Sequence, residues 1–237
     1  MIYQLLYMLF DKDVAIKFIC QRSVTLKIAG VYFFLQKPGD LVTICDCLLD
    51  GMYGGDREFI PTNGGVCLDI RANIGACTAF WIKKGRPGRV ITVEPHPDTC
   101  ERLHKNISLN SWDNVEIVNM ALSSQDGEID IAISQESAMA RIGWEQMDQM
   151  KVKSARLDTI LEQRGIESVE LCKIDVEGHE VHVLKGAKNS LSRIKRIIIE
   201  YHSMELRQEV IKMLEPLFSI VRIDDSDIGL IYAEVKN

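Results

Sequence analysis

Two short segments concentrate acidic and histidine side chains. Residues 175–180 read DVEGHE and follow one apolar run, and Glu200-Tyr201-His202 ends the next. Imidazoles, and carboxylates whose pKa is raised, can exchange protons near neutral pH, so both segments are suited to general acid–base chemistry. Because the carboxyl ends of neighbouring parallel strands meet at one edge of a sheet, we expect the two segments to converge.

A third segment, Asp69 to Gly75, is suited to holding a nucleotide-like ligand. An acid ends an apolar run, a turn with Gly75 follows, and a helix is expected to start around Thr78. Glu94 ends the next run, where an acid can accept hydrogen bonds from both ribose hydroxyls. The turn lacks the G-x-G-x-x-G pattern of dinucleotide enzymes, which disfavours a nicotinamide oxidoreductase and favours a ligand without pyrophosphate.

Continuous apolar runs separated by helical patterns must position these residues. Such runs are typical of strands buried on both faces of a parallel sheet. Between two of them, residues 97–109 begin with proline and carry an apolar face, as expected of a helix. Near the end of the chain, SIVRI and GLIYAEV flank a turn-forming DDSDIG and are expected to pair antiparallel. The runs are VCLDI, RVITVE, VEIVNMAL, LCKIDV and RIIIEY.

This pattern predicts a Rossmann-like α/β fold with a mostly parallel sheet, an antiparallel C-terminal strand and helices on both faces. The chain divides near residue 64. Residues 1–64 are expected to form an extension of helix, hairpin and loop that packs on the core, and residues 65–237 the ligand-binding domain. In the extension, VTLKI and VYFFL predict the hairpin, and residues 41–49 a helix.

Two segments lack a chemical motif of their own. The apolar stretch within residues 1–22 is interrupted by Asp11, Lys12 and Asp13 too early to span a bilayer, which favours a packing helix and a homo-oligomer contact. Residues 134–150 fit no clean period and are expected to form a substrate-contacting lid.

Composition narrows the class of partner. With 237 residues, a formal net charge of −6 gives no general attraction to nucleic acid or to anionic membranes, which favours a small-molecule acceptor. Seven cysteines form an odd, scattered set, so we expect reduced thiols and a cytoplasmic location.

Five segments together resemble the successive blocks of the FkbM-type methyltransferase family, over roughly residues 50–235. The resemblance implies a class I methyltransferase fold, S-adenosylmethionine as methyl donor, S-adenosylhomocysteine as product and transfer to a hydroxyl of a small or sugar-like acceptor. The segments are LDIRANIGACT, VEPHPDTCERLHKNISLN, VNMALSSQDGE, LCKIDVEGHEVHVLKGA and IIIEYH.

The same resemblance assigns cofactor contacts. Glu94 would bind the ribose, and Asp175 would face the methionine portion. Tyr53, in the loop before the first strand, would close over the site. The remaining assignments are Asp69, Ala72, Asn73 and Gly75 to the methionine side with Thr78 nearby, Pro95 and His96 to the flanks of the adenine, and the backbone of Ala121 and Leu122 to its edge.

The family ordinarily has glycine at the position of Arg71. If the backbone there needs a positive φ, a larger residue costs on the order of 1 to 2 kcal/mol. Three interpretations stay open. The side chain points to solvent, it impairs cofactor binding and leaves a binding or scaffold module, or it contacts the cofactor carboxylate.

An alcohol acceptor must lose its proton during methyl transfer. The candidate bases lie in the two acidic segments, with His202 and Glu177 favoured. An alternative places Mg²⁺ or Mn²⁺ on Asp175, Glu177 and Glu200 to orient a vicinal diol. The alternative to a catalytic interpretation gives Glu180 a structural role at a helix N-terminus, where a negative charge is favourable. The candidate bases are Asp175, Glu177, His179, Glu200 and His202.

Overall fold

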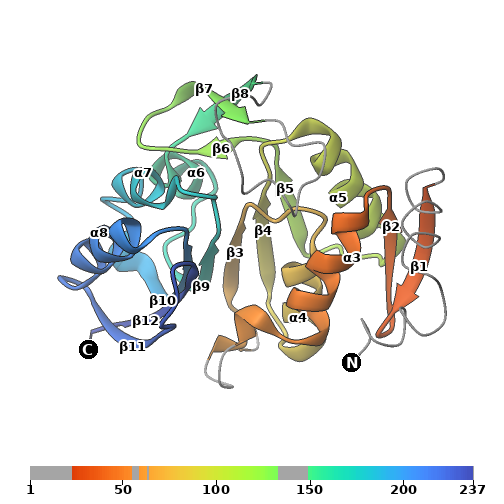
Figure 1. Cartoon of the computed structure of the whole chain (residues 1–237), viewed down its shortest axis with the longest axis horizontal. Coiled ribbons are helices and arrows are strands. Elements are labelled where there is room, and N and C mark those ends of the chain that lie inside the picture. Colours follow the sequence, from red (N-terminus) through yellow and green to blue (C-terminus); the bar gives the residue numbers. More distant parts are fainter. Residues whose placement is uncertain (1–22, 55–58, 63, 133–148, 237) are drawn as a thin grey trace.

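The computed structural model describes residues 23–54, 59–62, 64–132 and 149–236 (Figure 1). The apolar stretch of residues 1–22 and most of the expected lid at residues 134–150 lie outside these ranges. The packing helix and the lid therefore stay predictions. Only residues 149 and 150 of the lid segment are described, and they begin a strand.

A seven-stranded sheet forms the centre, in the order β11-β12-β10-β9-β3-β4-β5. The strands from β10 to β5 pair in parallel, whereas β12 is antiparallel to both β10 and β11. The expected mostly parallel sheet with an antiparallel C-terminal strand is confirmed. The bounds are β3 (Val66–Ile70), β4 (Arg89–Val93), β5 (Val115–Val118), β9 (Val169–Ile174), β10 (Ile194–Tyr201), β11 (Phe218–Ile223) and β12 (Gly229–Val235).

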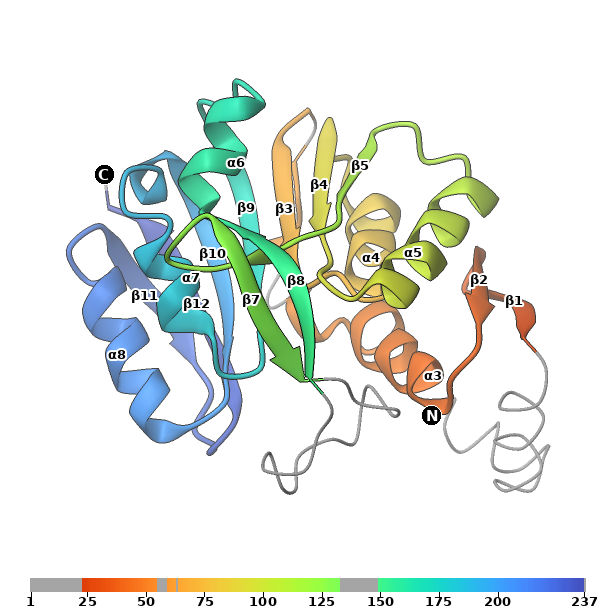
Figure 2. The same cartoon turned by 90° about the horizontal axis from the view of Figure 1, so that it is seen from above.

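Helices cover both faces of this sheet (Figure 2). Successive residues of a strand point to opposite faces, so Cys67 and Leu68 of β3 enter different hydrophobic clusters. Helix α4 begins at Ala76, two residues before the expected start, because Gly75 already adopts the N-cap position. One face carries α3 (Pro38–Ile44), α4 (Ala76–Lys84) and α5 (Pro97–Leu109), and the other α6 (Leu157–Gln163), α7 (Glu180–Lys185) and α8 (Met204–Leu214).

The expected hairpin is present as β1 (Val24–Ile28) and β2 (Val31–Leu35). Phe33 and Leu35 of β2 are fully buried in the same cluster as α3 and α4. Helix α3 continues as a π-helical turn over Cys45–Leu49, and a 3-10 turn follows at Met52–Gly54. The described part of residues 1–64 thus shares its core with the sheet, and the proposed division at residue 64 stays a prediction.

A smaller sheet of β6 (Ala121–Leu122), β8 (Gln149–Ala155) and β7 (Gly127–Ala132) lies beside the large one (Figure 1). The apolar run VEIVNMAL therefore forms two strands rather than one, because β5 ends at Val118 and β6 begins at Ala121. Between them, Asn119 donates its side-chain N–H to the carbonyl of Glu94 at 2.8 Å. This bond ties the chain reversal to the end of β4.

Six cysteines lie within the described residues, and all six are buried free thiols. Burial raises the pKa of the Cys100 thiol to about 11, so this thiol stays protonated at neutral pH. Among the helices that the structure describes, none is long and apolar enough to cross a membrane.

Candidate active site

The turn after β3 is built from left-handed backbone. Arg71, Asn73 and Gly75 have φ angles of 60°, 52° and 88°. A Cβ at position 75 would also lie 2.7 Å from the Leu103 side chain of α5, so both the left-handed conformation and the space favour glycine there. The backbone N–H of Ala72 donates to the carbonyl of Val93 at 3.0 Å, which folds the turn over the end of β4.

Glu94, at the end of β4, is held by this turn. One carboxylate oxygen accepts the N–H of Asn73 at 2.9 Å, and the other accepts the N–H of His96 at 3.0 Å. The residue is only 4% exposed, and burial raises its pKa although Arg71 and the two N–H donors oppose this. Each oxygen has a second lone pair that can accept a hydrogen bond from a ligand.

Lys173 of β9 joins two aspartates that sequence reasoning had placed in the site. Its ammonium lies 3.5 Å from Asp69 Oδ1 and 3.4 Å from Asp175 Oδ2, and Thr78 donates to the other Asp69 oxygen at 2.7 Å. Burial lowers the pKa of Lys173, but Asp175 and Asp69 outweigh it and raise that pKa overall. Sequence reasoning missed Lys173, although a lysine inside a continuous apolar strand was a usable signal.

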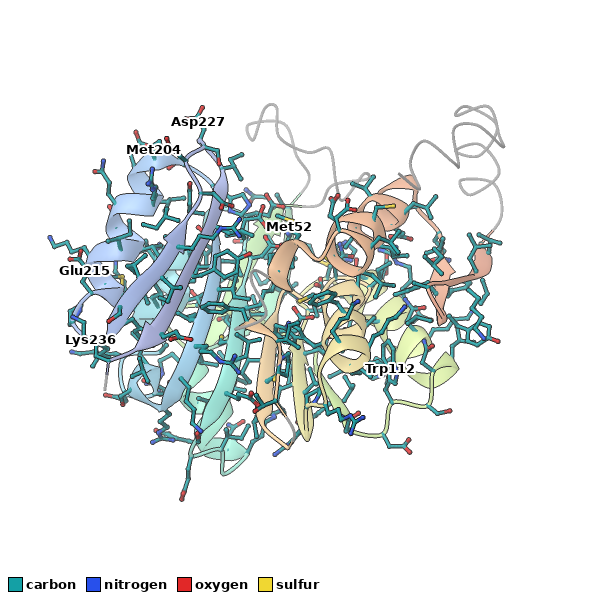
Figure 3. The ribbon with its side chains drawn as sticks, turned by 90° about the horizontal axis from the view of Figure 1, so that it is seen from below. Met52, Trp112, Met204, Glu215, Asp227 and Lys236 are labelled. Atoms are coloured by element: carbon teal, nitrogen blue, oxygen red, sulfur yellow. The ribbon has the colours of Figure 1, made fainter. Side chains whose placement is uncertain are left out.

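Tyr53 reaches the ends of β9 and β10. Its hydroxyl lies 2.6 Å from Glu200 Oε2 and 3.2 Å from Asp175 Oδ2, and the residue is buried. Burial and the neighbouring Asp175 charge raise the pKa of Glu200 to about 7. Figure 3 labels Met52, which directly precedes Tyr53. The segment carrying Tyr53 is anchored because Tyr232 of β12 donates to the carbonyl of Met52 at 2.8 Å.

His202 lies between carboxylates. Its Nδ1 is 2.8 Å from Glu180 Oε1, and its Nε2 is 3.3 Å from Glu177 Oε2 and 3.8 Å from Asp175 Oδ1. Burial lowers the pKa of His202, but the hydrogen bond to Glu180 and the charges of Asp175 and Glu177 raise it overall. The two acidic segments converge as the sheet geometry required, with Asp175, Glu177, Glu200 and His202 brought together.

Arg71 extends from the turn after β3 to the turn after β9. Its Nη1 lies 3.0 Å from Glu177 Oε1 and 3.6 Å from Asp175 Oδ1, and its side chain is 32% exposed. Burial lowers the pKa of Arg71, but Asp175 and Glu177 raise it overall, so the guanidinium is permanently charged. The side chain is thus directed along the site rather than out into solvent.

The other predicted residues have different surroundings. His179 contacts Ser123 Oγ at 3.0 Å and stacks on His182, with ring centroids 4.4 Å apart, so the structure shows it bound to neighbours outside the carboxylate cluster. Pro95 and His96 are half-buried at the start of α5, and Ala121 and Leu122 are buried in β6.

Three side chains could share a cation, since ligand atoms of Asp175, Glu200 and His202 lie within 4.8 Å of one another. The set expected from the sequence was Asp175, Glu177 and Glu200, so His202 takes the place of Glu177. Lys173 and Arg71 already supply positive charge to Asp175, and Tyr53 donates to Glu200. These contacts account for the cluster, and we assign no metal ion to it.

Several buried polar atoms at this edge of the sheet have no hydrogen-bond partner within the described ranges of the chain. They include Asn73 Oδ1, His96 Nδ1 and Asp175 Oδ1. Buried polar atoms are normally hydrogen-bonded, so unpaired acceptors beside Glu94 are suited to a ligand that brings amino and hydroxyl donors. The methionine amine and ribose hydroxyls of S-adenosylmethionine are donors of this kind.

Comparison with known proteins identifies the family. The Methyltransferase FkbM domain model matches residues 69–222. The chain belongs to the FkbM methyltransferase family. The expected resemblance is thereby confirmed, and the matched range contains every predicted cofactor and base residue except Tyr53.

This FkbM methyltransferase is similar in sequence to two curated methyltransferases. The hexuronic acid methyltransferase AglP of Haloferax volcanii is 32% identical over 149 residues, covering 63% of this chain and 61% of the relative. The 2-O-methyltransferase NoeI of Sinorhizobium fredii is 26% identical over 159 residues, covering 60% and 65%. The chain thus spans less than two thirds of the length of either relative.

The fold comparison agrees with the family. The crystal structure of an FkbM methyltransferase from Methylobacillus flagellatus superposes with a TM-score of 0.59 at 16% sequence identity, covering 93% of this chain and 58% of that one. The expected Rossmann-like methyltransferase fold is confirmed.

Proposed function

We propose that this protein is an S-adenosylmethionine-dependent O-methyltransferase that acts on a hydroxyl of a small or sugar-like acceptor. The observation that carries the proposal is the convergence of Tyr53, Asp175, Glu200 and His202 at the carboxyl ends of β9 and β10. In open α/β sheets, ligands bind at this edge. The printed names of AglP and NoeI, a hexuronic acid methyltransferase and a 2-O-methyltransferase, support a sugar hydroxyl as the acceptor.

The residues at the ends of β3 and β4 fit the cofactor. Glu94 would accept the ribose hydroxyls through its remaining lone pairs, and Asn73 Oδ1 would take a donor that it lacks in the protein. Pro95 and His96 would flank the adenine. When bound, S-adenosylmethionine supplies a methyl group activated by a sulfonium.

The chain's own residues would deprotonate and orient the acceptor. Glu200, with a pKa of about 7, and His202 are the proton acceptors whose ionisation lies nearest neutral pH. Lys173 and Arg71 keep Asp175 ionised beside them, because each lies within 3.6 Å of that carboxylate. Tyr53 fixes the Glu200 carboxyl, so positioning of the hydroxyl accompanies removal of its proton.

Arg71 would bind the carboxylate of the cofactor's methionine portion. Its guanidinium lies beside Asp175, which we assign to the methionine side, and within the described part of the chain only Nη1 contacts Glu177 and Asp175. A charge-assisted hydrogen bond contributes about 1.5 to 3 kcal/mol. The lower end of this range is above the lower end, about 1 kcal/mol, of the cost of a positive φ. Arg71, which replaces the glycine usual in the family, would then contribute to cofactor binding.

Calorimetric titration with S-adenosylmethionine and S-adenosylhomocysteine tests this proposal. We expect both to bind the wild type, Arg71→Gly to weaken binding about tenfold, and the charge-retaining Arg71→Lys to fall between them. No binding to the wild type at millimolar ligand, together with measurable affinity in Arg71→Gly, would instead support the alternative of a cofactor-impaired binding or scaffold module. That alternative lacks a specific contact in its favour, since the side chain is drawn to Glu177.

The acceptor is tested by transfer of a labelled methyl group. Neutral hexosides and hexuronic acids should be offered side by side, since one relative is named for a hexuronic acid. Labelled product from either sugar class supports the proposal. Transfer only to amines would contradict the assignment to oxygen.

A further inference from the structure

Glu180 is a fully buried carboxylate that begins α7, with 0% exposure. Its Oε1 accepts the backbone N–H of Gly178 at 2.9 Å and lies 2.8 Å from His202 Nδ1. Its Oε2 has no hydrogen-bond partner among the residues that the structure describes. An ionised Glu180 can only accept hydrogen bonds, and in that state Nδ1 of His202 carries the proton of the second bond.

The backbone before α7 arranges this contact. Glu177 and Gly178 have φ angles of 51° and 100°, so the chain reverses sharply between β9 and α7. The reversal places Glu180 at one nitrogen of the His202 ring and Glu177 at the other. The Glu177 side chain is 34% exposed whereas Glu180 has no exposure, so a ligand has access on the Nε2 side.

We propose that Glu180 is a positioning residue that fixes His202 as the Nδ1–H tautomer and directs Nε2 toward the acceptor hydroxyl. This inference rests on the proposed function. With Nδ1–H retained by Glu180, the lone pair of neutral His202 is on Nε2. The hydroxyl O–H bond breaks, its proton moves to Nε2 to give an imidazolium, and the bonding electrons remain on the acceptor oxygen.

Burial lowers the pKa of His202 but the acids around it raise that pKa overall, so the neutral form that accepts the proton is the main form only above that pKa. Four acids face it from the elements around it. Glu180 lies on α7, Asp175 and Glu177 follow β9, and Glu200 lies on the same strand end. An orienting carboxylate behind an imidazole stabilises the imidazolium formed on proton transfer. Loss of Glu180 should therefore affect the chemical step more than cofactor binding.

Nitrogen-15 NMR of the histidines in the full chain tests the tautomer without cofactor or acceptor. We expect neutral His202 in the wild type to carry its proton on Nδ1. Glu180→Met, which removes the acceptor, should give a mixture of tautomers. Glu180→Gln, which keeps a carbonyl acceptor but removes the charge, should retain Nδ1–H and lower the pKa of His202 by about one pH unit.

Kinetics provides the second measurement. Both variants should lower kcat on the order of 100-fold, with the acidic limb of the pH profile moved to lower pH in Glu180→Gln and the Kd of S-adenosylhomocysteine unchanged. Asp158→Asn is the matched control. Asp158 is also a buried carboxylate, which holds Asn189 and Ser190, and its loss should leave the tautomer and the pH profile unchanged.

A neutral His202 protonated on Nε2 in the wild type would overturn the proposal. So would Glu180 variants with the wild-type tautomer and pH profile, even if their stability fell. Failure of the proposed function has a different signature, namely absent binding of S-adenosylhomocysteine to the wild type. The tautomer is measured without cofactor or acceptor, so positioning by Glu180 can be tested even if the proposed function fails.

Discussion

Two groups of charged side chains differ in charge balance. One is the pair of Asp40 and Arg102, and the other is the set of acids around Lys173. The Asp40–Arg102 pair joins α3 to α5 at 2.5 Å with 0% and 2% exposure of the side chains. Asp40 also accepts the N–H groups of Gln36 and Lys37. Here one acid meets one base, and both carboxylate oxygens are used.

The group around Lys173 is unbalanced. Six acids face two permanent cations and a histidine, and Asp175 Oδ1 has no hydrogen-bond partner. A matched buried pair maintains the fold, whereas excess charge with unused acceptors leaves a site ready for a donor-rich ligand. The acids are Asp69, Glu94, Asp175, Glu177, Glu180 and Glu200, and the cations Arg71 and Lys173.

The largest expected effect tests the balanced pair. Asp40→Ala leaves the Arg102 charge buried without its partner, which should lower the free energy of unfolding by about 3 to 5 kcal/mol. Urea denaturation measures the loss. Asp50→Ala is the control, because Asp50 is exposed and its loss should change stability by less than about 0.5 kcal/mol. Equal effects of the two substitutions would show that the buried pair has no structural role.

Glu200→Gln tests the unbalanced group through pH. The folded-state pKa of Glu200 is about 7, above its ordinary 4.5, because burial and Asp175 disfavour the charged form. A raised pKa contributes stability that is full below the unfolded value and lost as pH rises through the folded value. From pH 5 to pH 8, the wild type should therefore lose about 2 kcal/mol from this group.

In Glu200→Gln this loss should disappear, so the variant gains stability relative to the wild type as pH rises. His202 also has a raised pKa and contributes a loss of the same sign in both proteins, so the difference between them reports Glu200 together with its interaction with His202. Thermal unfolding at pH 5, 6, 7 and 8 provides the measurement. Parallel curves for the two proteins would contradict a raised pKa at Glu200.

The smallest expected effect concerns ligand binding. Glu94→Gln keeps an acceptor for the N–H of Asn73 but removes the charge that the ribose hydroxyls would meet. The Kd of S-adenosylhomocysteine should rise about tenfold. Stability should also fall, because the amide NH2 group replaces the oxygen that accepts the N–H of His96. Asp98→Asn, an exposed acid in the first turn of α5, should leave that Kd unchanged. An unaltered Kd in Glu94→Gln would remove Glu94 from the cofactor site.

The sheet could be predicted from sequence because strands buried on both faces are continuously apolar. VCLDI, RVITV and RIIIEY each became a strand of the parallel core. The convergence of Asp175 with His202 followed from the same argument, since it needs only neighbouring parallel strands. The break inside VEIVNMAL could not be foreseen, because it depends on Asn119 reaching the Glu94 carbonyl.

Two features of the site could not be predicted from the sequence and are seen only in the structure. The direction of Arg71 depends on Glu177, which is distant in sequence but lies across the paired ends of β3 and β9. The contact of Glu180 with His202 depends on left-handed backbone at Glu177, which side-chain patterns do not encode. Sequence fixes which strand ends meet, whereas rotamers and turns decide which atoms meet there.

The hydrogen bond from Tyr53 to Glu200 joins residues 147 positions apart. At ribosomal rates of about 5 to 20 residues per second, Tyr53 is synthesised roughly 7 to 30 seconds before its partner. Contacts of such sequence separation form late and slow folding. β3 and β4 can pair while the chain is being made, whereas the group of Tyr53, Asp175 and Glu200 can assemble only after β9 and β10 have joined the sheet.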